Sequence, residues 1–291
     1  MIGQVIQYNG AAASIPMVNG TVNVPPGSGT IRYTATGPNG PETVDQAITV
    51  RAPSLLYGNN GITVSADGAI VNGVVNSGAG GQVSVGNDST IGNLFSLSPV
   101  RLFDRSTTGV IQTSAGVTPG QNDHILGIIR TTPTLVSFPS LVASYTSVTA
   151  VNVAPDAKQT LAPGQFGKVT VNSRGQLTLS AGTYDFTGLD LEPQAHLVVP
   201  ANVENVKIFV RDNIVYRGTT NLNNGASAPV YLGFTGTAPV ILESPFVGTA
   251  VAPNATLTLQ TVSAPHTGEF FAKQVNVSAH TIVNSNAFSC H

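Results

Sequence analysis

The chain has 291 residues and a formal net charge of −2, and only 9% of its residues are charged. Ordinary globular domains carry about 25% charged residues. The 12 Lys and Arg residues are scattered between Arg32 and Lys273 without a concentrated basic face. Nucleic-acid binding needs such a face, so the composition argues against a nucleic-acid partner.

Composition also indicates the fold class. The chain contains 31 Gly and 19 Pro, while 41% of its residues are hydrophobic and β-branched residues are common. This mixture is typical of many short strands joined by Gly, Asn and Pro corners. No segment shows a helical period, so we predict an all-β protein.

The setting of the protein can be predicted in outline. A weakly charged, hydroxyl-rich composition is commoner in exported proteins. The opening MIGQVIQYNG has neither the charged nor the apolar region of a signal peptide, and no apolar run is long enough to cross a bilayer. The single cysteine, Cys290, allows no disulfide within the chain. We expect a fragment of a longer exported protein, extracellular or at the cell surface, with no transmembrane segment.

Residues 1–52 form a distinct segment. Strands are predicted at 4–9, 21–24, 30–37 and 43–50, and GPNGPE at 37–42 has the composition of a hairpin turn. The stretch TIRYTATGPNGPETVDQAITV resembles the final hairpin of bacterial immunoglobulin-like repeats. Because a full sandwich needs about 100 residues, we predict a partial immunoglobulin-like, antiparallel segment or a short cap.

A short repeat begins after residue 53. Four segments share an apolar–x–apolar start and a polar corner; they begin at Ile62, Val83, Val100 and Val117, with spacings of 21, 17 and 17 residues. Eight residues after these starts stand Ile70, Ile91, Thr108 and Ile125. A period near 17 fits the small rungs of a β-solenoid, which bury a common core by stacking. We predict a solenoid over 53–288, with an irregular, proline-containing excursion at about 132–163.

Three stretches carry a resemblance to a known family: LAPGQFGKVTVNSRGQLTLSAGTYDFTGLDLEPQAHLVV, FVGTAVAPNATLTL and HTGEFFAKQVNV. They resemble the phrases APGxYGxVxVxxxxxLxLxxGxYxF, GTxxAPxAxVxL and HxGAFFAKxxxV of a domain common in large exported proteins of myxobacteria and related bacteria. The resemblance spans roughly 55–288, with Glu269 where that family usually has Ala. It implies an exported, single-stranded parallel β-helix, expected to be right-handed, and no established activity.

Two groups of residues are candidates for catalysis. Asp190 and Glu192 are two apart on a predicted strand, so both could face one side and act as acid and base on a glycosidic bond. His266, Glu269 and Lys273 could perform general acid–base work on a sugar or an ester. The alternatives are a solvated corner for the first pair, and a packing role for the second segment, where Phe270 and Phe271 look like core residues.

Candidate ligand contacts are aromatic and cationic. Tyr184, Tyr216 and Tyr231 lie at predicted strand edges and could stack on a sugar ring; the alternative is partial burial in the core. Lys207, Arg211 and Arg217 lie close in sequence and could form a modest anion-binding stripe. Asp212 is not expected to pair with Arg211, because adjacent strand residues point to opposite faces.

The spacing of the five His residues predicts no metal site, and no sequence motif for a cofactor is present.

Taken together, these patterns favour a non-catalytic extracellular or cell-surface module with a structural or adhesive role. The alternative is a carbohydrate-active protein that binds or cleaves an extracellular polysaccharide along one solenoid face, as a polysaccharide lyase or glycoside hydrolase would. The expected partners are extracellular polysaccharide or other copies of the chain. Residues 1–52 and the C-terminal NSNAFSCH (284–291) are expected to cap the terminal rungs.

Overall fold

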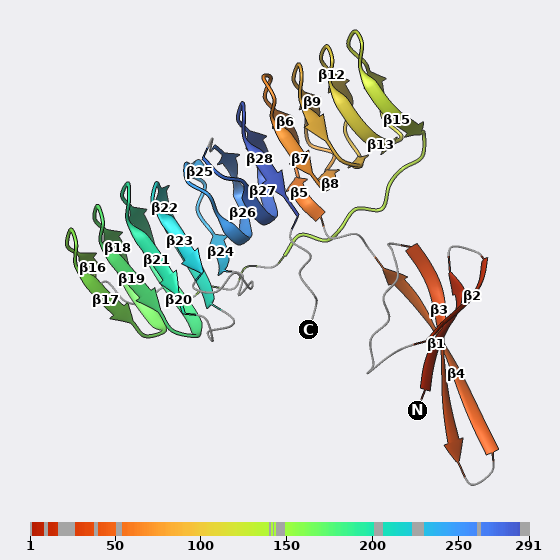
Figure 1. Ribbon diagram of the computed structural model, residues 1–291, viewed down its shortest axis with the longest axis horizontal. Helices are drawn as coiled ribbons and strands as arrows, with labels where there is room; N and C mark the ends of the chain where they lie inside the picture. Colours follow the sequence, from red (N-terminus) through yellow and green to blue (C-terminus); the bar gives the residue numbers. More distant parts are fainter. Residues whose placement is uncertain are drawn as a thin grey trace. The chain divides into compact units, whose positions relative to one another are not determined.

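The computed structural model describes residues 2–8, 11–16, 27–37, 40–50, 54–139, 141, 143, 149–200, 206–222, 230–260 and 263–285. These ranges contain strands and connecting segments, and they confirm the all-β prediction (Figure 1). None of the described residues forms a helix that is long and apolar enough to cross a membrane. The chain divides into two compact units, Met1–Pro53 and Ser54–His291.

Unit 1 is a four-stranded antiparallel sheet. Its strands are β1 (Ile2–Tyr8), β2 (Ala11–Pro16), β3 (Gly27–Gly37) and β4 (Gly40–Val50), in the order β2-β1-β3-β4. Arg32 on β3 pairs in register with Asp45 on β4, and its guanidinium contacts both carboxylate oxygens, at 2.7 and 2.8 Å. The strand predicted at 21–24 lies outside the described residues, and the immunoglobulin-like assignment stays a prediction.

Unit 2 is a parallel β-solenoid of about 10 turns, which confirms the predicted fold class, while the hand of its coil stays a prediction. The strands before residue 130 are β5 (Ser54–Gly58), β6 (Gly61–Val64), β7 (Ile70–Asn72), β8 (Val74–Ser77), β9 (Gln82–Val85), β10 (Thr90–Ile91), β11 (Leu94–Ser96), β12 (Val100–Leu102), β13 (Thr107–Thr113), β14 (Val117–Thr118) and β15 (His124–Ile129). The later strands are β16 (Val151–Val153), β17 (Lys158–Leu161), β18 (Gly164–Val171), β19 (Gln176–Leu179), β20 (Gly182–Leu191), β21 (His196–Val199), β22 (Val206–Tyr216), β23 (Thr219–Leu222), β24 (Val230–Phe234), β25 (Val240–Leu242), β26 (Val247–Leu259), β27 (His266–Val277) and β28 (Ile282–Asn284).

The repeat predicted from the sequence is the stacking register of the first rungs. The predicted starts pair directly, in the order Ile62, Val83, Val100 and Val117. Ile91, Thr108 and Ile125 also stack as predicted. Ile70, however, pairs with Thr90, and Val71 takes the place beside Ile91. The reason is that the corner between β6 and β7 is one residue longer than the corner between β9 and β10.

The order of the rungs in space differs from their order in the chain. The last strands, β27 and β28, pair with the first, β5, β6 and β7. The chain thus enters at the middle of the stack, winds to β15 at one end, returns to β16 at the other end, and winds back to the middle (Figure 1). Ten rungs are separated by nine steps of about 4.8 Å and span about 43 Å, which the segment 130–150 can cover because an extended residue spans up to about 3.5 Å.

This arrangement corrects the expected positions of the caps. Asn284 pairs with Asn72, and the N–H of Ser285 donates to the carbonyl of Asn72, so this part of the predicted C-terminal cap lies mid-stack. Residues 286–291, including Cys290, lie outside the described residues. The ends of the stack are formed instead by β14 with β15 and by β16 with β17.

One core runs through unit 2, across the junction of β27 with β5. Successive residues of one of its columns pair in register and are at most 3% exposed; they are Tyr184, Ile208, Leu232, Ala250, Phe270, Leu56, Val75, Leu94 and Ile111. The contact of Phe270 with Leu56 is equivalent to any other step of the column. The two halves of the solenoid are therefore joined by a normal rung interface.

The irregular excursion is shorter than predicted. Strands resume at Val151 with β16 and β17, inside the range 132–163 that the sequence analysis expected to be irregular. Pro155 and Pro163 stand in the corners that flank β17. Proline lacks a backbone N–H and is compatible with a corner, so these prolines separate strands rather than prevent them.

The described part of segment 130–150, called the return segment below, covers an apolar outer surface. Tyr57, Val251 and Phe271 face outward, yet each is at most 8% exposed because Leu135, Val136, Phe138 and Leu141 pack on them. The ring of Phe138 lies edge-on to Tyr57 and Phe271, with centroids 5.3 and 5.9 Å apart. Phe270 and Phe271, both predicted as core residues, thus pack on opposite sides of β27.

Replacing Phe138 with alanine is expected to lower the free energy of unfolding by about 2 kcal/mol, less than for a fully buried Phe because its ring is partly exposed. The same change should speed proteolytic cleavage within 130–150. Urea denaturation and timed proteolysis would check both effects. Phe95→Ala on β11 is the matched control, since Phe95 also faces outward but lies outside this cluster. Equal cleavage rates in the two variants would contradict the anchoring role of Phe138.

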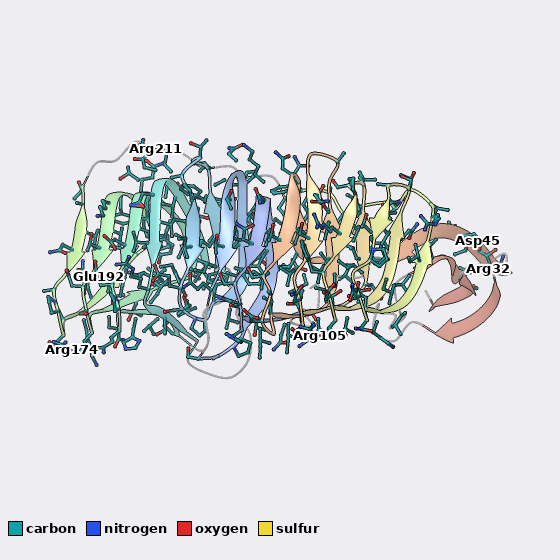
Figure 2. The ribbon with its side chains drawn as sticks, turned by 90° about the horizontal axis from the view of Figure 1, so that it is seen from above. Arg32, Asp45, Arg105, Arg174, Glu192 and Arg211 are labelled. Atoms are coloured by element: carbon teal, nitrogen blue, oxygen red, sulfur yellow. The ribbon has the colours of Figure 1, made fainter. Side chains whose placement is uncertain are left out.

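In the described part of unit 2, eight rungs turn one corner through a non-glycine residue with left-handed φ. In the first rungs these residues are Asp67, Asp88, Arg105 and Asn122, with φ between 57° and 64°. Their side chains point outward, and Arg105 forms a two-point ion pair with Asp88 on the preceding rung, with contacts of 2.7 and 2.6 Å. Arg174 and Asp156 repeat this pairing near the other end of the stack, where Arg174 lies at the periphery (Figure 2).

Candidate functional site

Asp190 and Glu192, the predicted acid–base pair, lie on the outer side of β20 and the following corner, flanking buried Leu191. Asp190 Oδ2 lies 3.1 Å from Lys168 Nζ on the neighbouring rung. Both carboxylates also act on Arg217, whose pKa is raised mainly by its hydrogen bond to Glu243, 3.1 Å away. The predicted pair therefore belongs to a surface network of alternating charges.

His266 is separated from the residues predicted to act with it. Strand alternation points His266 into the core, where it is 0% exposed, and leaves Glu269 and Lys273 on the outside. The His266 ring packs edge-on to Phe270, and its Nδ1 accepts a hydrogen bond of 3.2 Å from the N–H of Phe246. Nε2 is buried without a hydrogen-bond partner, and burial lowers the pKa to about 4. His266 is thus a neutral core residue, and this triad does not form.

Glu269 is the other predicted acid whose environment is unusual. It pairs in register with Thr249, which pairs with Tyr231, so Glu269 and Tyr231 share one outer face two rungs apart. Burial raises the pKa of the Glu269 carboxyl. Two rungs correspond to about 9.6 Å. Glu269 and Tyr231 are therefore too far apart to hold a single proton between them.

Arg211 and Asp212 form an ion pair, so the prediction that they do not pair is wrong. Arg211 Nε and Nη2 contact the two carboxylate oxygens of Asp212 at 2.7 and 3.0 Å, and this hydrogen bonding lowers the pKa of Asp212. Phe186 pairs with Val210, but Gly188 pairs with Asn213, so two residues of β22 lie opposite one residue of β20. This bulge breaks the alternation and turns both side chains outward.

Two of the three tyrosines that were predicted to contact a ligand are buried in the core. Tyr184 is fully buried and its hydroxyl is 2.9 Å from the carbonyls of Leu161 and Ser180. Tyr216 is 1% exposed and its hydroxyl lies 2.6 Å from Thr220 Oγ1, while burial raises its pKa to about 12. A sugar cannot reach either ring. Tyr231 is partly exposed and packs against Phe209 and the cluster of Tyr57, Val251 and Phe271.

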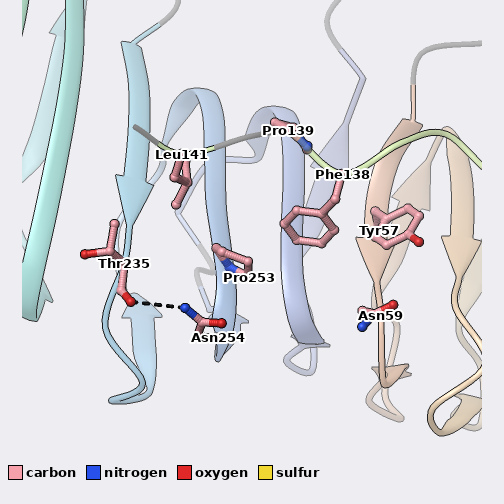
Figure 3. A pocket seen from close by; sticks show the side chains of 8 residues that line it. All are labelled: Tyr57, Asn59, Phe138, Pro139, Leu141, Thr235, Pro253 and Asn254. Carbon is pink, nitrogen blue, oxygen red and sulfur yellow. Dashed lines mark hydrogen bonds between the residues drawn. The ribbon is translucent and has the colours of Figure 1, made fainter. Parts of the chain in front are cut away.

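A groove that the sequence analysis did not predict lies between the return segment and the rungs (Figure 3). Its volume is about 480 Å³, and its lining combines aromatic rings, prolines and amides: Tyr57, Asn59, Phe138, Pro139, Leu141, Thr235, Pro253 and Asn254. Asn254 Nδ2 donates to the carbonyl of Thr235 at 3.2 Å. Ala252, Ala272 and Gly58 stack in register on three successive rungs. Lys273, which follows Ala272, therefore lies on the rung between those of Asn254 and Asn59, and its side chain is exposed. Local patterns could not reveal this groove, since its walls come from segments far apart in the chain.

The groove offers hydrogen bonding and apolar contact rather than acid–base chemistry, since no carboxylate or histidine is among its lining residues. In the parts of unit 2 and unit 1 that the structure describes, no group of three or more His, Cys, Asp or Glu side chains is placed to hold a metal ion.

Comparisons with known proteins add no relative to this description of the fold and the groove. The resemblance to the exported myxobacterial family therefore stays a prediction, while the β-solenoid that it implied is present. No known family, no curated protein and no solved structure matches this chain.

Proposed function

We propose that the chain is a non-catalytic structural or adhesive module that works outside the cell or at the cell surface. The observation that carries this proposal is the single core that runs through the whole solenoid, including the junction of β27 with β5. A stack whose rungs are joined by backbone hydrogen bonds and one buried core resists bending, which suits a rigid spacer. The weakly charged composition supports an exported setting.

The positions of several predicted catalytic and ligand-binding groups support the same proposal. His266 is enclosed by aromatic core residues, and Asp190 is paired with Lys168. Arg211 forms an ion pair with Asp212, and Arg217 forms one with Glu243. Groups that make such contacts are poorly placed to exchange protons with a substrate or to bind it.

A second candidate function is binding of an extracellular polysaccharide in the groove of Figure 3. Its volume of about 480 Å³ lies within the range of about 300–1,000 Å³ typical of ligand sites. Sugar rings bind through apolar stacking together with hydrogen bonds to amides, and Phe138, Asn59 and Asn254 offer both. Tyr57 is only 8% exposed, so it would contribute an edge rather than a platform.

The two functions are separated by incubating the protein with a panel of extracellular polysaccharides and measuring both its retention and the release of new reducing or unsaturated ends. We expect no product; product release would overturn the non-catalytic proposal. Retention that falls at least about tenfold in Asn59→Ala or Asn254→Ala, but not in the control Asn276→Ala on β27, would establish the groove as a binding site. Retention equal in all variants would refute the groove.

A further inference from the structure

One end of the solenoid exposes an apolar edge. β15 pairs with β13 in the described structure and lies at the end of the stack (Figure 1). Leu126, Ile128 and Ile129 on β15 are 70%, 39% and 47% exposed. Only three other large hydrophobic side chains in the described residues are comparably exposed, so half of this set is concentrated on one six-residue strand. Such an edge normally carries charges or is covered.

Ile128 is a core residue without a covering rung. It continues the buried column through Leu94 and Ile111, and Ile111 is 0% exposed where Ile128 is 39% exposed. At the junction in the middle of the stack, Leu56 covers Phe270 although no chain segment connects their two rungs directly. A core residue at a rung edge can therefore be covered by a rung that is not the next one in the chain. The β15 end therefore has the structure of half a rung interface.

The opposite end of the stack, formed by β16 and β17, does not expose a matching apolar edge. Val151, Val153 and Leu161 in its terminal rung are at most 8% exposed. Its exposed side chains are polar, proline or alanine, with no large hydrophobic among them, namely Asn152, Ala154, Pro155, Asp156, Lys158, Gln159, Thr160, Ala162 and Pro163. Lysine and proline are the residues that protect strand edges from pairing. An apolar end gains more from meeting another apolar end than from meeting this one.

We propose that two copies of the chain meet end to end through β15, related by a twofold axis. Antiparallel pairing of β15 with itself, with the axis at Gly127, would place Leu126 opposite Ile128 of the second copy. A twofold contact is closed, so the assembly stops at a dimer. The inference goes beyond the proposed function and does not depend on it, since a polysaccharide-binding chain would dimerise equally well.

The size of the end predicts the strength of the contact. One rung contains about 17 residues, which is below the 20–30 residues a side of a standard interface. We therefore expect a dissociation constant in the micromolar range, so concentrations from about 1 to about 500 µM must be covered.

Sedimentation velocity of the full chain over this range tests the proposal. We expect a monomer–dimer equilibrium that Ile128→Lys weakens by more than about 100-fold, because the twofold axis duplicates the lost contact and the added charge. Ile241→Lys on β25 is the matched control, because Ile241 is 40% exposed but lies mid-stack. A monomer at every concentration, species larger than a dimer, or an equal effect of both variants would overturn the proposal.

Cross-linking tests the position of the axis without relying on the charged variant. A Cβ at Gly127 would meet nothing within 4 Å, so Gly127→Cys is tolerated by the fold, and a Cys290→Ser background removes the native thiol. We expect mild oxidation to give a disulfide-linked dimer. Gly116→Cys, equally open but outside β15, is the control. Equal yields from Gly116→Cys and Gly127→Cys would overturn the β15 contact.

Discussion

Replacing Gly268 with alanine is expected to lower the free energy of unfolding by more than about 4 kcal/mol, or to prevent the protein from accumulating in folded form. Gly268 has φ of 144°, a conformation that residues with a Cβ rarely adopt, and a Cβ there would overlap the carbonyl oxygen of Gly248 on the adjacent rung. Backbone strain and overpacking of about 1–3 kcal/mol each act together here. Urea denaturation, with soluble yield as the second measurement, would check the result.

Gly127→Ala is the control for this prediction. Its Cβ would meet nothing within 4 Å, so we expect a change within about 1 kcal/mol. If both variants lost the same stability, the cost at Gly268 would reflect the loss of glycine in general and not the close approach of neighbouring rungs.

Acid is expected to destabilise the protein through His266 in a defined pH range. Burial lowers the pKa of His266 to about 4 in the folded state, against 6.5 for an ordinary histidine. Between these values the unfolded chain binds a proton that the folded chain excludes, so the free energy of unfolding falls as the pH falls from 6.5 to 4. The total loss is about 3 kcal/mol, and it is complete below pH 4, where both states carry the proton.

His266→Asn is the variant that isolates this effect. The Asn Oδ1 can accept the hydrogen bond from the N–H of Phe246 but does not titrate, so the slope between pH 6.5 and 4 should be lost. Urea denaturation of both proteins at several pH values gives the difference. Asp88 and Asp156, whose pKa values are lowered by hydrogen bonds from arginines, contribute equally to both proteins and cancel. An unchanged slope in the variant would show that another group titrates in this range.

Strand alternation predicts the direction of some candidate-site side chains correctly and fails for others. Strand alternation correctly places Asp190 and Glu192 on one side, and applied to His266 and Glu269, three residues apart, it would have separated them. It fails at Arg211 and Asp212, because a bulge depends on the number of residues in the neighbouring rung. The groove depends on Phe138, which reaches Tyr57 only because the chain returns along the stack.

The sequence by itself determined that unit 2 is a β-solenoid and, apart from Ile70, which residues of the first rungs stack. Spacings of 21 and 17 residues and period-two alternation are local properties, and Ile62, Val83, Val100 and Val117 stack accordingly. Only the tertiary structure decided the order of the rungs. Rungs are joined by backbone hydrogen bonds and by similar apolar columns, so any rung edge can accept many others, and no local pattern specifies that Leu56 covers Phe270. That choice leaves β15 at an end of the stack and His266 beside the junction at its centre.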